Sequence, residues 1–74
     1  MTLRQARNVP HMLCGDVPGL DGTRLAVDLP ADLLDRCTVW VIGPTMASAH
    51  LDLAGVEAML ALLVDVAHRM RGNG

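Results

Sequence analysis

Hydrophobic and polar side chains alternate along the segment TRLAVDL, where every second residue from Leu25 to Leu29 is aliphatic. Alternation with a period of two is typical of a strand that buries one face. The segment CTVWVIG is rich in β-branched side chains and predicts a second strand. A Gly-Pro-Thr turn separates it from MASAHLD, which can return antiparallel as a third strand. The pattern therefore predicts strands over residues 24–29, 37–42 and 47–51.

A helix is predicted over residues 53–70, where Asp52 can serve as N-cap and two arginines stand near the C-terminal end. With residues placed about 100° apart around the axis, the charged and imidazole side chains fall within a sector of about 120°. The apolar side chains cover about 200° of the remaining circumference. A helix that lies on one sheet typically needs an apolar stripe of little more than about 100°. One flank of this helix is therefore left without a partner in the predicted sheet.

The first 23 residues show no sustained period, because prolines and glycines interrupt short apolar clusters in NVPHMLCGDVPGLDG. We expect a loop-rich N-terminal arm over residues 1–23, with at most one short strand near His11 to Cys14, a single domain over residues 24–71 and a disordered tail over residues 72–74. The expected fold class is α+β. It consists of a small three-stranded antiparallel sheet with one C-terminal helix packed on it, preceded by the arm.

A chain of 74 residues has a marginal core, and domains of this size usually gain stability from disulfides, a metal or association. We interpret the free helix flank as the contact of a homodimer. Trp40 is the only aromatic residue and suits a binding anchor, although core packing under the helix is an equal alternative. The expected interface residues are Val56, Met59, Leu62, Leu63, Val66, Met70 and Trp40. Alternatively, the arm covers the flank with Val9, Met12, Leu13 and Leu20.

Candidate chemistry is sparse. Zinc could be held by two sulfurs and two nitrogens from His11, Cys14, Cys37 and His50. Zinc sites usually show two closely spaced ligand pairs, whereas the second pair here is split across a predicted hairpin, so we expect no metal and no cofactor. A cysteine nucleophile would need a base such as His50, and no local motif supports that arrangement. Asp28, Asp32 and Asp35 fit a solvated acidic turn. We therefore expect no enzyme activity.

Charge and composition narrow the partners further. The net charge is −2 at pH 7 and the arginines are scattered, so nucleic acid is not an expected partner. No apolar run approaches the roughly 20 residues needed to span a bilayer, and the N-terminal residues lack the apolar core of a secretory signal. The expected location is the cytoplasm, with reduced thiols. The absence of lysine, phenylalanine and tyrosine, whose codons are AT-rich, indicates a GC-rich gene.

The segment AHLDLAGVEAMLALLVDVA resembles the C-terminal strand and helix of many short, uncharacterised proteins of actinobacteria and their bacteriophages. That resemblance covers roughly the last 35 residues and implies a strand-rich domain with a C-terminal helix, without catalytic residues. LDLAGV also resembles a strand end of anti-sigma factor antagonist (STAS) domains. Their Asp-Ser-x-Gly turn is absent, because no serine follows Ser48, so this second resemblance transfers no phosphoswitch.

The function expected from the sequence is a non-catalytic protein-protein interaction module. We interpret it as a homodimeric phage or mobile-element accessory protein that binds and modulates a host protein. A small zinc-binding or nucleic-acid-associated regulatory protein is one alternative, and a minor virion structural component is another. The surplus apolar surface supports protein binding on physical grounds, whereas the phage or mobile-element assignment rests on chain size and coding composition.

Overall fold

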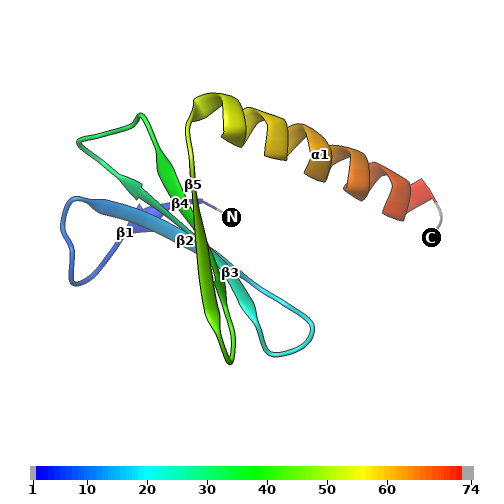
Figure 1. Cartoon of the computed structure of the whole chain (residues 1–74), viewed down its shortest axis with the longest axis horizontal. Helices are drawn as coiled ribbons and strands as arrows, with labels where there is room; N and C mark the ends of the chain where they lie inside the picture. Colours follow the sequence, from blue (N-terminus) through cyan, green and yellow to red (C-terminus); the bar gives the residue numbers. More distant parts are fainter. Residues whose placement is uncertain (1, 73–74) are drawn as a thin grey trace.

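The computed structural model describes residues 2–72. These residues form one antiparallel sheet followed by one helix (Figure 1). The sheet is a meander in which each strand pairs with the next along the chain, in the order β1-β2-β3-β4-β5. The elements are β1 (Arg4–Gln5), β2 (Met12–Pro18), β3 (Arg24–Pro30), β4 (Cys37–Ile42), β5 (Met46–Leu51) and α1 (Leu53–Gly72).

The α+β class, the antiparallel sheet and the single C-terminal helix are confirmed, but the sheet has five strands where three were predicted. The additional strands lie in the segment predicted as a loop-rich arm over residues 1–23. Strand β2 pairs with β3 along its whole length, with Leu13 opposite Leu29 and Val17 opposite Leu25. Gly15 replaces an apolar side chain in the middle of β2, which hides the alternation that the strand otherwise follows.

The three predicted strands and the helix are found within a few residues of their predicted bounds. Gly72, which the sequence assigned to a disordered tail over residues 72–74, is the last residue of α1. Residues 73–74 of that predicted tail lie outside the described residues. No helix within residues 2–72 combines the length and the apolar character needed to cross a bilayer.

The sheet has one apolar and one polar face. Residues that stand opposite each other in an antiparallel pair project from the same side of the sheet, so the register assigns each side chain to a face. We call one side the apolar face; it carries Leu13, Val17, Leu25, Val27, Leu29, Val39, Val41, Ala47, Ala49 and Leu51. We call the other side the polar face; it carries Arg4, Cys14, Asp16, Arg24, Asp28, Thr38, Trp40, Ser48 and His50, together with the apolar Met12, Ala26, Ile42 and Met46.

The helix does not pack on the sheet, contrary to the prediction. Among the described strands α1 contacts only β5, and it projects away from the sheet beyond the end of that strand (Figure 1). The physical reason is the junction, because Asp52 is the single residue between β5 and α1 and leaves no loop in which the chain could turn back. The side chains of the three predicted strands lie on the expected sides of the sheet. The helix α1, however, leaves the apolar side of the sheet uncovered.

The described chain has almost no interior of its own. Cys37, which is 7% exposed, is the one residue of 2–72 that is buried. The alternative in which the N-terminal arm covers the helix is wrong: the arm is part of the sheet, and Val9 and Leu20 are both exposed. Neither the apolar face nor the helix is therefore sheltered within one chain.

Candidate functional site

The six interface residues predicted on the helix all lie in α1 and are all exposed. Their exposed fractions range from 39% at Val56 to 70% at Met70. With residues about 100° apart, Leu63 stands at the centre of the apolar arc. We call this arc the helix stripe; it comprises Val56, Met59, Leu60, Leu62, Leu63, Val66 and Met70. An exposed stripe of this size marks an interaction surface more often than solvent-facing structure.

The position of the helix is fixed at its first turn. The Asp52 carboxylate accepts a hydrogen bond from the Gly55 backbone N–H at 2.9 Å, and the Asp52 carbonyl accepts one from the Val56 N–H at 2.9 Å. The predicted N-cap is thus confirmed. A Cβ added at Gly55 would come within 3.2 Å of a Leu51 methyl carbon, so the first turn lies tightly against the end of β5.

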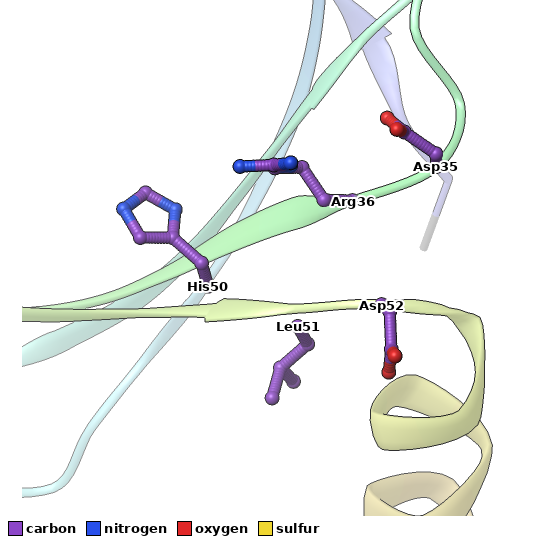
Figure 2. Close-up of a pocket in the computed structure, with 5 residues that line it drawn as sticks. All are labelled: Asp35, Arg36, His50, Leu51 and Asp52. Atoms are coloured by element: carbon purple, nitrogen blue, oxygen red, sulfur yellow. The ribbon is translucent and has the colours of Figure 1, made fainter.

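Figure 2 shows the same junction from the side, with His50 and Leu51 projecting from opposite sides of β5. The first turn of α1 lies on the side of Leu51. Because Leu51 belongs to the apolar face, the helix leaves the sheet on its apolar side. The helix and the apolar face therefore lie on the same side of the sheet.

The apolar face is a candidate site that the sequence interpretation missed. It crosses all the longer strands, from β2 to β5, and includes exposed side chains such as Val17, Leu25 and Val41. The alternation in β3 and β4 indicated such a face. The predicted cover of this face, however, was the protein's own C-terminal helix.

Trp40 lies on the polar face, apart from the helix stripe with which it was grouped. Its indole N–H donates a hydrogen bond to the Asp28 carboxylate at 2.9 Å, and the pair is partly buried. Beside it, Asp16 stands between two arginines, with Arg24 at 3.3 Å and Arg4 at 3.6 Å. Such exposed ion pairs contribute little to stability, and they leave the polar face well hydrated.

An open depression of about 520 Å³ lies where β5 meets the helix, and Asp35, Arg36, His50, Leu51 and Asp52 line it (Figure 2). His50 Nδ1 is 3.0 Å from the Thr38 hydroxyl oxygen, across β4 and β5. A hydroxyl nucleophile with an imidazole base also needs a third group that orients the imidazole. No such group is hydrogen-bonded to His50 among residues 2–72. Two carboxylates, one guanidinium and one imidazole thus line the depression, and within residues 2–72 no third group orients the imidazole.

The structure does not bring the four candidate zinc ligands together. Cys14 stands opposite Asp28 on the polar face, whereas Cys37 stands opposite Leu51 on the apolar face. Both cysteines are free. Within the described part of the chain, no three potential ligand side chains are grouped closely enough to hold a metal ion.

Comparison with known proteins gives no relative for this chain. No family model matches it, and neither curated protein sequences nor solved structures gave a significant match.

Proposed function

We propose that the protein is a non-catalytic protein-protein interaction module that acts as a homodimer. The observation that supports this proposal is the surface area of the single chain. The chain exposes 6216 Å², whereas a compact monomer of its 7.9 kDa mass exposes about 4,400 Å². The difference is about 1,800 Å² for each chain, relative to a compact globule.

This excess area has the size of an obligate interface. Stable interfaces of standard size bury about 800 Å² on each partner, and obligate homodimers bury roughly 2,000–5,000 Å² in total. Two copies of this chain that each hid the excess would bury about 3,600 Å² together, within that obligate range. A second copy supplies an equal area with the same apolar character, so that neither chain keeps a bare apolar surface.

The apolar side chains involved are large enough to drive association. A fully exposed Leu, Val or Met side chain contributes about 1.5–3 kcal/mol when it becomes buried. The seven side chains of the helix stripe are about half exposed, so the two stripes of a dimer together contribute roughly 10–20 kcal/mol, comparable with or larger than the association cost of about 4–15 kcal/mol. Because the interface residues are exposed in the single chain, their burial on association is available to stabilise a complex.

The partner beyond the homodimer, in this proposal, is a host protein that the dimer binds and modulates, with the protein acting as a phage or mobile-element accessory factor in the cytoplasm. Two features support this assignment: the composition indicates a GC-rich gene, and the two free cysteines suit a reducing cytoplasm. The polar face, with Trp40 and the Arg4–Asp16–Arg24 cluster, is the surface that a homodimer built on the apolar side leaves open to that partner.

Sedimentation velocity of the full chain over a wide concentration range tests the homodimer. We expect a species of two chains that persists to low concentration, because an interface in the obligate range dissociates weakly. A single chain at the highest concentration would overturn the proposal. Large rings or tubes would instead favour the virion component, since they require a contact that does not close on two copies.

A further inference from the structure

We infer that the apolar face of the sheet is the seat for the α1 helix of a second copy, so that two chains exchange their C-terminal helices. This inference rests on the proposed homodimer and specifies how its two chains are joined. Its starting point is that one chain carries two complementary apolar surfaces that do not touch each other. The helix contacts only β5 among the described strands, and the apolar face keeps Val17, Leu25 and Val41 exposed.

The two surfaces have matching dimensions. A helix of 20 residues is about 30 Å long. Neighbouring strands lie about 4.8 Å apart, so the four strands β2–β5 that carry the apolar face make it about 14–19 Å wide. One helix laid across the strands therefore spans the face from edge to edge. The stripe that a sheet requires is little more than about 100° wide, and the helix offers more than that.

The relief of the apolar face also suits a helix. The central strands contribute Leu25, Val27 and Val39, whereas β5 contributes the small side chains of Ala47 and Ala49, with Leu51 at its end. Bulky stripe residues such as Leu63 fit over the low alanines and beside the central ridge, in the way that helices pack large against small positions. The helix stripe and the sheet relief are therefore complementary in shape.

Burial of this contact needs no charge to be desolvated. The residues that the register places on the apolar face between β2 and β5 are aliphatic apart from Gly15 and Cys37. Glu57, Asp65 and Arg69 lie outside the stripe, and Arg71 lies at its edge in the last turn, about 20° from Leu60, where its guanidinium can remain in water. Arg69 and Asp65 form an exposed pair at 3.3 Å that remains in water. No buried charge therefore opposes the packing of helix on sheet.

A chain cannot place its own helix on its own apolar face while the junction stays intact. Asp52 is the only residue between strand and helix, and its carboxylate and carbonyl both bind the first turn. Gly55 also lies tightly against Leu51. Turning the helix back would break these contacts. A second chain meets the same need without any change in conformation, because its helix already projects beyond its own sheet (Figure 1).

Reciprocal exchange closes on two copies. Each chain packs its helix on the sheet of its partner, so the same contact forms twice around a two-fold axis. No helix stripe and no apolar face is then left unpaired. The occupant of the apolar face is thus specified as the α1 helix of a second copy of this chain.

Cross-linking between singly substituted full-length chains tests the exchange. The background carries Cys14→Ser and Cys37→Ala. One chain carries Leu63→Cys on the helix stripe, and the other carries Ala49→Cys on the apolar face. A matched control replaces Ala49→Cys by Ser48→Cys, the neighbouring residue on the polar face. Differently tagged chains are co-expressed and treated with a short bis-maleimide, and mixed-tag products are identified by mass.

We expect the Leu63→Cys chain to cross-link to the Ala49→Cys chain and to lose this product with Ser48→Cys. Ala47→Cys provides a second position on the apolar face if the Ala49 variant folds poorly by circular dichroism. A dimer that cross-links through neither alanine position, or equally through Ser48→Cys, would overturn the exchange while leaving the homodimer intact. A single chain at all concentrations would overturn both the exchange and the proposed function.

Discussion

The indole nitrogen of Trp40 donates a hydrogen bond to a carboxylate oxygen of Asp28 at 2.9 Å, between neighbouring central strands β4 and β3. The indole thus gains a charged acceptor on the polar face. On the opposite, apolar face, the neighbouring pairs of β3 and β4 are aliphatic, Leu25 with Val41 and Val27 with Val39. A tryptophan usually finds a partner for its N–H when it is partly buried, which explains why the only aromatic residue of the chain does not lie on the apolar side.

Replacement of Asp28→Ala removes the acceptor of this bond. Because the indole is only partly buried, water can replace the carboxylate in part, and we expect a loss of about 1 kcal/mol in the free energy of unfolding. The emission of Trp40 should also shift to longer wavelength as water approaches the indole. Urea unfolding followed by Trp40 fluorescence measures both effects. Asp28→Asn keeps an oxygen acceptor and serves as control; equal stability of the Ala and Asn variants would contradict the role of the bond.

The strands could be predicted where alternation is uninterrupted. Between Arg24 and Leu51 the β-branched and alternating residues define three strands and the face of each side chain, and the structure confirms them. Of strand β2 only a short segment near residues 11–14 was predicted, because Gly15 has no side chain to show the period. Its membership of the sheet depends on pairing with β3, for which Leu13 opposite Leu29 is one example. Such a partner is remote in sequence and is not encoded in a local period.

The candidate site was predicted in part, for a related reason. The periodicity of α1 identifies which side chains form the helix stripe, and these side chains are exposed in the chain. Periodicity does not say which surface covers them. The direction of the helix is set by the single residue Asp52 between β5 and α1, so the apolar face that it leaves bare could not be recognised. The contact of Trp40 with Asp28 likewise requires the register of two strands.

Acid pH should affect the hairpin between β2 and β3 through Asp21. The Thr23 hydroxyl and then the Thr23 backbone N–H donate hydrogen bonds to the Asp21 carboxylate and lower its pKa below the ordinary value. A carboxyl whose pKa is lower in the folded chain stabilises the fold above its unfolded pKa of about 3.9. That contribution is lost as the pH falls through the lower folded pKa. The hairpin should therefore loosen only at strongly acid pH.

The replacement Thr23→Val removes the hydroxyl and keeps the backbone N–H. We expect the Asp21 pKa to rise toward its ordinary value without reaching it, because the second hydrogen bond remains. The carboxyl carbon shift of Asp21, followed by NMR across acid pH, reports this change. Thr45→Val, in the hairpin between β4 and β5, is the matched control. An Asp21 titration that is identical in the Thr23 and Thr45 variants would refute the assigned cause.

The helix cap should be measurable in isolation from the sheet. Asp52→Ala removes the acceptor of the Gly55 N–H, and loss of such a cap costs about 0.5–2 kcal/mol. Because α1 has contacts with β5 alone among the described strands, we expect a lower helical signal in far-UV circular dichroism as well as a lower thermal midpoint. Asp52→Asn preserves a capping oxygen and should remain close to the parent. If the Ala variant matched the Asn variant in both measurements, the cap would not hold the junction.

The homodimer should depend on the centre of the helix stripe. Leu63 and Val66 are 57% and 49% exposed in the single chain, so neither supports the fold of that chain. Because each is about half exposed, its burial contributes about half of the 1.5–3 kcal/mol of a fully exposed side chain, and a dimer contains two copies of each. Replacement of both residues by Asp should then weaken dimerisation by roughly 10²–10⁴-fold. We expect a monomer with its strands retained and its helical content retained or partly reduced, as measured by sedimentation and circular dichroism.

Ala58→Asp together with Ala61→Asp is the matched control, since it introduces the same two charges in the polar sector of the same helix. Because Ala is a stronger helix former than Leu or Val, the alanine variant loses at least as much helix propensity as the Leu63 and Val66 variant. A dimer that survives in the alanine variant and is lost in the Leu63 and Val66 variant assigns the contact to the stripe. Unfolding of the Leu63 and Val66 variant at every concentration would instead place those side chains in the core of a folded monomer, with the helix turned onto its own sheet.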